Sequence, residues 1–311
     1  MLVSSQIKEK AIALGFHKVG IADARSDYRD HATSNLDKWI SLGYHGNLSW
    51  MENQKRWDIL EYMPDVRSVI VLATNYYTSH QHSQDPVFAK ISRYGWGKDY
   101  HKIIQSKLKE LSHWIETHDD SIVTRFCVDT SPLQEKVWAQ RAGLGWIAKN
   151  SNLISREYGS WIFLSEILVN FPLTPDSSAG NHCGTCSRCI ESCPTAAIVE
   201  PYVVDSSKCI AYHTIENREA ELPVEISAKL EQWVAGCDIC QDVCPWNQRF
   251  AKVTDIAEFN PYPENIAPRL SELANISDEQ WKERIQGSAL KRIKSTMIRR
   301  NARANLKSVK N

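Results

Sequence analysis

A dense array of cysteines limits the possible folds of this chain more than any other feature. Eight of the nine cysteines lie between residues 183 and 244. The first four follow the spacing C-x2-C-x2-C-x3-C-P in the segment CGTCSRCIESCP, residues 183–194. In bacterial ferredoxins this run gives three thiolates to one [4Fe-4S] cluster and its fourth thiolate to another cluster. The array therefore predicts a small fold built around two clusters.

A second array supplies the remaining thiolates. Its last three cysteines repeat the x2 and x3 spacings and again end in Cys-Pro, whereas Cys209 stands alone between the two arrays. Regular spacing would place this ligand at Val234, so Cys209 is a departure from a simple repeat. Because the fourth cysteine of each run crosses over, the predicted ligands are Cys183, Cys186, Cys189 and Cys244 for the first cluster, and Cys193, Cys209, Cys237 and Cys240 for the second.

Two structural zinc sites are the alternative interpretation of these cysteines. Zinc held by four thiolates also uses C-x2-C pairs. It has no use, however, for a third cysteine at the same spacing or for the Cys-Pro endings. The pattern therefore favours iron–sulfur clusters, and with them a role in electron transfer.

The charge balance and the N-terminus indicate a protein of the reducing cytoplasm. Basic and acidic residues both number 37, so the total charge favours neither acidic nor basic partners. The first residues carry charges where a signal peptide needs an apolar run, and they hold no twin-arginine pair. The longest apolar runs, at 68–73 and 161–169, are far shorter than the roughly 20 residues of a membrane helix. We therefore expect no contact with a membrane.

The residues before the cysteines predict a mixed α and β domain. Apolar residues at helical spacing predict helices at 5–16 and 99–118. Short apolar runs predict strands at 18–23, 68–77 and 121–129.

Composition changes along the chain divide it into three parts. Residues 171–182, with two prolines and several small polar residues, predict a linker. From Arg284 onward there are nine Lys or Arg residues and no acid. We predict an α+β fold with a catalytic domain at 1–172, a double-cluster domain at 173–250 and a basic helical segment at 251–311.

The stretch GLGWIA at residues 143–148 fits the dinucleotide-binding pattern G-x-G-x-x-A. That pattern needs a preceding strand and a following helix, whereas LQEKVWAQRA before it is helical in character. We therefore predict Gly143 as the end of a helix and Gly145 as part of a loop.

Asp129 lies where a predicted strand meets a predicted helix. Alternation along 121–129 places Val123, Arg125, Cys127 and Asp129 on one face. Ser131 is expected to cap the next helix, with Pro132 at its first position and Gln134 completing a capping box. Asp129 is then either a site residue or an acid stabilised by the helix dipole, and Cys127 is more typical of a small buried hydrophobe than of a reactive thiol.

Four segments together resemble the epoxyqueuosine reductases. These are residues 91–102 (ISRYGWGKDYHK), residues 128–150 (VDTSPLQEKVWAQRAGLGWIAKN), the cysteine arrays and residues 287–301 (GSALKRIKSTMIRRN). The resemblance implies a nitroreductase-like corrinoid-binding domain followed by a ferredoxin-like domain with two [4Fe-4S] clusters. It also implies that the clusters pass electrons to cobalamin, which reduces the epoxide of epoxyqueuosine at the tRNA wobble position to queuosine.

The same resemblance assigns roles to individual residues. Asp129 becomes the proton donor, with its pKa raised by burial against corrinoid and substrate. Substrate contacts fall on Asp99, Tyr100 and His101. The implied corrinoid contacts are Cys127, Arg141, Gly143, Gly145, Lys149 and Asn150, and the implied tRNA contacts are Lys291, Arg292, Lys294, Arg299 and Arg300.

Two other functions stay open from the sequence. One is a corrinoid and iron–sulfur reductase of a small organic molecule, similar to reductive dehalogenases. The other is an electron-transfer module without a further cofactor. For the reductase of epoxyqueuosine we expect a monomer that is served by a low-potential electron donor.

Overall fold

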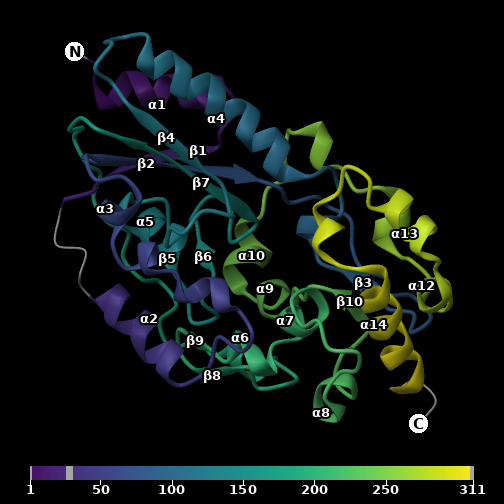
Figure 1. Cartoon of the computed structure of the whole chain (residues 1–311). Coiled ribbons are helices and arrows are strands. Elements are labelled where there is room, and N and C mark those ends of the chain that lie inside the picture. The colour runs from purple at the N-terminus through teal and green to yellow at the C-terminus, as the bar shows by residue number, and fades with distance from the viewer. Residues whose placement is uncertain (1, 26–30, 309–311) are drawn as a thin grey trace.

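The computed structural model describes residues 2–25 and 31–308. A four-stranded antiparallel sheet in the order β1-β2-β7-β4 organises the first half of the chain (Figure 1). Its strands are β1 (Lys18–Asp23), β2 (Ser68–Asn75), β4 (Thr124–Cys127) and β7 (Ile162–Val169).

Helices cover both faces of this sheet, which explains why all residues of β2 are buried. One face carries Ile70 and Leu72 against α1 (Ser4–Ala13) and α4 (Tyr100–Glu116). The opposite face packs on α3 (Ile59–Tyr62) and α5 (Glu135–Arg141). A strand that is covered on both faces reads as a continuous apolar run.

The strands and helices predicted for this half are confirmed in type, and α4 is the clearest case. Its buried side chains Ile104, Leu108, Leu111 and Ile115 recur at helical spacing. Asp99 caps the helix by accepting a hydrogen bond from the His101 amide at 3.2 Å.

The predicted strand at 121–129 and the predicted helix start were wrong in detail. The strand ends at Cys127, and Asp129 has a φ of 55°, which turns the chain away from the sheet. Helix α5 begins only at Glu135, without a capping box. The Ser131 side chain does not cap α5, and its backbone carbonyl oxygen accepts the Leu133 N–H in a turn at 2.9 Å.

The cysteine-bearing part consists of short elements. They are α6 (Arg188–Glu191), β8 (Ile198–Glu200), β9 (Val203–Val204), α7 (Ile210–Ile215), α8 (Val224–Ser227), α9 (Ile239–Asp242) and α10 (Pro245–Phe250). The proline after Cys244 occupies the first position of α10, where a missing amide proton costs nothing. A hairpin of β5 (Trp146–Ile147) and β6 (Leu153–Ile154) packs beside Cys244.

The C-terminal segment packs on strands from both earlier parts. Its helices are α11 (Pro263–Ile266), α12 (Leu270–Asn275), α13 (Asp278–Arg284) and α14 (Ser295–Ser308). They share a core with β3 (Lys90–Ile91) and β10 (Trp233–Ala235), which pair in parallel. Helix α2 (His31–Ser41) lies beside β8 and β9 (Figure 1). None of the helices within 2–25 and 31–308 has the length and apolarity needed to cross a bilayer.

Candidate functional site

Three side chains form a hydrogen-bonded chain at the beginning of α4. His101 Nδ1 lies 2.8 Å from Asp99 Oδ1, and His101 Nε2 lies 3.1 Å from Asp129 Oδ2. The Asp99 and His101 side chains are 13% and 25% exposed, whereas that of Asp129 is 49% exposed. The Asp129 carboxyl group is therefore accessible to solvent, and it is hydrogen-bonded to the His101 imidazole, which is in turn hydrogen-bonded to the Asp99 carboxylate.

The electrostatics of this chain favour a proton on His101. The hydrogen bond to Asp129 raises the pKa of His101, against burial, which lowers it, and Asp99 raises it further. Burial alone would raise the pKa of Asp129, but the bond and charge of His101 outweigh it, so this pKa is lowered. In the free protein the two groups thus hold a transferable proton mainly as imidazolium beside carboxylate.

Two further carboxyl groups lie behind Asp129. Glu135 Oε1 accepts the backbone N–H of Asp129 at 2.7 Å. Burial, and then the charge of Asp129, raise the pKa of Glu135 to about 7. Glu166 on β7 is completely buried and neither of its oxygens has a hydrogen-bond partner. Burial and the nearby Glu135 raise the pKa of Glu166, so this side chain holds a proton.

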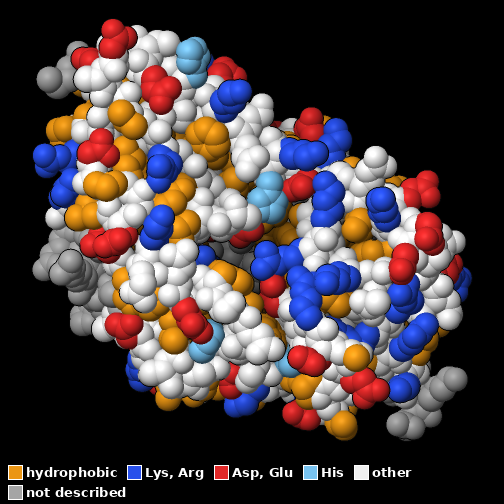
Figure 2. All heavy atoms as spheres, viewed as in Figure 1, with side chains coloured by type: hydrophobic (Ala, Val, Ile, Leu, Met, Phe, Trp, Pro, Cys, Tyr) orange, Lys and Arg blue, Asp and Glu red, His pale blue; other side chains and the backbone are white. Residues whose placement is uncertain are grey.

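The other side of the site is basic. Lys291 Nζ lies 4.0 Å from Asp99 Oδ2, and Arg292 donates to Glu216 at 2.8 Å. The charge of Asp129 contributes to the raised pKa of Arg292, after the bond to Glu216. Figure 2 shows a hollow at the centre of this face, with Lys and Arg side chains gathered on the side of the C-terminal helices.

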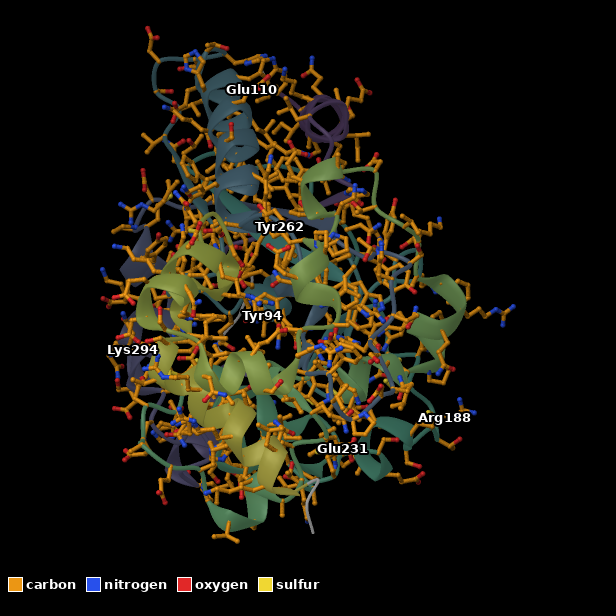
Figure 3. The ribbon with its side chains drawn as sticks, turned by 90° about the vertical axis from the view of Figure 1, so that its right-hand side faces the viewer. Tyr94, Glu110, Arg188, Glu231, Tyr262 and Lys294 are labelled. Atoms are coloured by element: carbon orange, nitrogen blue, oxygen red, sulfur yellow. The ribbon has the colours of Figure 1, made fainter. Side chains whose placement is uncertain are left out.

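Tyr94 connects this site to the cysteine arrays. Its side chain is half-buried and packs against the core of the first half of the chain, and Figure 3 labels it near the centre of the view. Burial raises the pKa of Tyr94, and the charges of Asp238 and Asp129 add to the effect. Since Asp238 follows a predicted cluster ligand, the surroundings of Tyr94 reach from the proton-bearing chain to the second array.

The predicted cluster ligands lie close to one another, both within each predicted set and between the sets. The pKa of Cys189 is raised by burial and by the charges of Cys244, Cys183 and Cys186. Burial raises the pKa of Cys240, and the charges of Cys209, Asp238, Cys189 and Cys193 add to the effect. The pKa of Cys237 is raised by burial and by the charges of Cys209 and Cys240. No group of three His, Cys, Asp or Glu in the described part of the chain is arranged to hold a single metal ion.

The predicted corrinoid contacts Lys149 and Asn150 touch the cysteine arrays. Lys149 Nζ donates to the carbonyl oxygens of Gly184 and Cys186 at 2.7 and 2.9 Å. The buried amide of Asn150 donates to the carbonyl oxygen of Cys240 at 3.2 Å. Both side chains therefore fix the positions of the loops that carry the cysteines.

The remaining predicted corrinoid contacts are also engaged within the protein. Gly143 follows the end of α5 with a φ of 74°, as predicted, and lies against the backbone of Ser177. Gly145 packs against the backbone of β6. The thiol of Cys127 is buried 3.4 Å from the Tyr62 hydroxyl, and burial raises its pKa to about 11. The Arg141 guanidinium lies over the ring of Trp138.

The basic C-terminal residues divide into two groups. Arg300 donates to the carbonyl oxygens of His213 and Asn217 at 2.7 and 3.0 Å, and Arg299 donates to Asp278 at 2.7 Å. These two guanidinium groups hold elements of the protein together. Lys291, Arg292 and Lys294 are exposed, and Figure 3 shows Lys294 at the surface.

Sequence reasoning missed Glu135 and Glu166 as residues of the site. Glu135 follows the stretch interpreted as a capped helix, where an acid is common and needs no further role. Glu166 lies in the apolar stretch WIFLSEILV. A charged residue in a strand that is buried on both faces is unusual, and this could have marked Glu166 as a candidate site residue. Tyr100, predicted at the substrate, is buried and stacked on Phe163 and His101, so it supports the ring of His101.

Comparison with known proteins gives matches along the whole chain. Residues 56–130 match the family described as "Epoxyqueuosine reductase QueG, DUF1730", and residues 182–247 match the "4Fe-4S double cluster binding domain". The epoxyqueuosine reductase of Synechocystis sp. is 57% identical over 93% of this chain and all of its own length. That of Atelocyanobacterium thalassa is 52% identical over 98% of this chain and 99% of its own.

Solved structures give the same result for the fold. An epoxyqueuosine reductase crystallised with an epoxyqueuosine-modified stem loop of tRNA-Tyr matches with a TM-score of 0.89 at 31% identity, over 98% of this chain and 81% of its own. The Bacillus subtilis enzyme, with the loop of its catalytic aspartate swung out of the active site, matches with a TM-score of 0.87 at 29% identity, over 98% and 81%. This chain belongs to the epoxyqueuosine reductase family.

Proposed function

We propose that this protein reduces the epoxide of epoxyqueuosine in tRNA to the alkene of queuosine. The reaction consumes two electrons and two protons, and the epoxide oxygen leaves as water. Family membership supports the substrate. The observation that carries the chemistry is the chain from Asp99 through His101 to Asp129, because it presents a half-exposed carboxyl group that the adjoining imidazole can reprotonate.

The electrons are proposed to pass through two [4Fe-4S] clusters that are supplied by a low-potential donor. The clustering of the thiols in two sets of four supports the predicted crossed ligation. A backbone N–H of Ala197 donates to Cys193 Sγ at 3.3 Å, the kind of bond that tunes cluster potentials.

Cobalamin is the proposed acceptor of these electrons, and the surroundings of Tyr94 fit such a group. Tyr94 lies against Gly236, which precedes the predicted ligand Cys237, and the N–H of the neighbouring Arg93 donates to Asp238 at 2.8 Å, so a group next to Tyr94 would lie close to the second array. When bound there, cobalamin would supply a low-potential metal centre that delivers electrons to the substrate.

The protein's own residues handle the protons. Asp129 protonates the oxygen as the epoxide opens, which avoids the formation of a free alkoxide. His101 then returns a proton to Asp129, and Asp99 keeps the imidazole oriented and charged. The raised pKa of His101 favours the protonated form of this reserve.

The exposed basic residues Lys291, Arg292 and Lys294 are proposed to hold the tRNA backbone. Lys291 Nζ lies 4.0 Å from Asp99 Oδ2, and Arg292 and Lys294 follow it closely in the chain, so phosphate groups of an anticodon loop would pass them as the modified base approaches Asp129. A relative crystallised with a tRNA stem loop supports this choice of partner.

The function is tested by mass analysis of nucleosides from epoxyqueuosine-containing tRNA. The protein is incubated anoxically with the tRNA and a strong reductant, with and without cobalamin. We expect queuosine only when cobalamin is present. Protein with about eight iron atoms, the content of two [4Fe-4S] clusters, that forms no queuosine would overturn the proposal.

A further inference from the structure

We propose that Glu135 is a positioning residue that holds the loop of Asp129 in the conformation in which Asp129 meets His101. The inference deepens the proposed function and rests on the role given there to Asp129. Its basis is the hydrogen bond of 2.7 Å from the Asp129 backbone N–H to Glu135 Oε1.

The loop needs such a support because its own backbone does not favour this shape. Residues 128–134 join β4 to α5 without helix or strand. Asp129 stands in the left-handed region, at a φ of 55°, which costs less for aspartate than for most residues but still favours glycine, and which persists where surrounding contacts enforce it. Within the loop, the bonds are short-range, from Thr130 to Val128 and from Leu133 to Ser131.

Glu135 is well placed to enforce this conformation. It is the first residue of α5, so its backbone is fixed by the helix, while its side chain reaches back to the residue that carries the proton donor. The bond joins the N–H of Asp129 and leaves the Asp129 carboxyl group free to bind His101. Glu135 thus fixes the backbone at Asp129, the residue with the left-handed φ.

A second tether acts on the far end of the same loop, whereas the backbone at the Asp129 end is held by Glu135 and the Asp129 carboxyl group by His101. Arg56 Nη1 donates to the Leu133 carbonyl oxygen at 3.1 Å, and Gln134 Nε2 donates to the Arg56 carbonyl oxygen at 3.0 Å. Neither bond reaches residues 128–130. Release of Glu135 would therefore loosen the backbone at Asp129, whose side chain alone would then hold it to His101, while the start of α5 stays in place.

The related Bacillus subtilis structure with its catalytic loop swung out indicates that loops of this kind have two positions. When a loop exchanges between two conformations, their relative populations change steeply with each bond that is present in only one of them. The bond from Asp129 to Glu135 has a charged acceptor when Glu135 is ionised, and such bonds are the stronger class.

The test compares Glu135→Ala with Glu135→Gln in the full-length protein loaded with clusters and cobalamin. The glutamine keeps an oxygen that can accept the Asp129 N–H, whereas alanine removes it. Hydrogen exchange of the 128–134 peptide is measured by mass spectrometry, and turnover of epoxyqueuosine-containing tRNA gives kcat and KM. Glu225→Ala, which removes an exposed acid from the first turn of α8, is the matched control.

We expect faster exchange of 128–134 and about a tenfold lower kcat in Glu135→Ala, with KM for tRNA unchanged. Glu135→Gln and Glu225→Ala should stay within about threefold of the parent protein in both readouts. Unchanged exchange in Glu135→Ala would overturn the proposal, whether or not the protein turns over. Loss of iron from both Glu135 variants would also overturn it, because it would assign Glu135 a general structural role.

Discussion

Asp129→Asn is the most informative substitution for the proposed mechanism. Asparagine keeps the size of the side chain and a hydrogen bond to His101, but it has no acidic proton. A positioned general acid contributes roughly 100- to 10,000-fold in rate, which corresponds to about 3–5 kcal/mol. Because the Asp129 side chain is 49% exposed, water can partly replace it. We therefore expect a loss of about 100-fold in kcat, at the lower end of that range.

The pH dependence gives a second, independent measure of the same mechanism. Since the pKa of His101 is raised above 6.5, the imidazolium persists to higher pH in the folded protein and is lost as the pH rises through that raised value. The kcat/KM of the parent protein should therefore be level at low pH and fall on the alkaline side. His101→Gln should abolish this fall, because glutamine does not titrate.

Single-turnover measurements provide the assay, with nucleosides from the quenched tRNA analysed by mass. Asp119→Asn, at an exposed position beyond the other end of α4, serves as the matched control and should react like the parent protein. An Asp129→Asn variant with an unchanged rate and an unchanged pH profile would refute the role of Asp129. An alkaline fall that persists in His101→Gln would refute the role of His101.

Three further predictions concern the clusters, the core and the tRNA surface. Cys209→Ser should leave the first set of thiols complete, so anoxic iron and absorbance analysis should find about four iron atoms, and loss of all eight would contradict the crossed sets. The stability of the parent should fall by up to about 1.4 kcal/mol per pH unit above the ordinary pKa of glutamate, because Glu166 keeps a proton in the folded state that it releases in the unfolded chain. Glu166→Gln should abolish this fall, and equal thermal midpoints of variant and parent from pH 5 to 8 would contradict the prediction. Lys294→Ala should weaken tRNA binding and reduce its salt dependence by about one unit of slope without a change in melting temperature, whereas Arg300→Ala should lower the melting temperature; the reverse pattern would contradict the division of the basic residues.

The features that could be predicted from the sequence depend on short-range spacing. Cluster thiolates come from runs of a few residues, so the grouping of Cys183, Cys186 and Cys189 follows from local geometry. Helix α4 has its apolar stripe and its cap, Asp99, within one continuous segment. Such signals survive folding because no distant part of the chain is needed to satisfy them.

The features that escaped prediction depend on partners far away in the chain. The order Ser131, Pro132, Gln134 satisfies the rules for a helix start, but the contact of Glu135 with Asp129 and the tether from Arg56 stabilise a loop there. In the same way, nothing local distinguishes Arg300, which binds carbonyl groups more than 80 residues earlier, from an arginine that binds phosphate.

The parallel pairing of β3 with β10 has a consequence for the synthesis of the protein. Residues 90–91 leave the ribosome long before their partners at 233–235, and the core around Trp96 waits for α12 and α14 as well. Trp96 therefore lacks part of its surroundings until both cysteine arrays have been translated. Asp99, His101 and Asp129 are made early, but the hydrogen bond of 2.7 Å from the Asp99 N–H to the Gly287 carbonyl oxygen, at the start of α4, forms only once the C-terminal segment has been made.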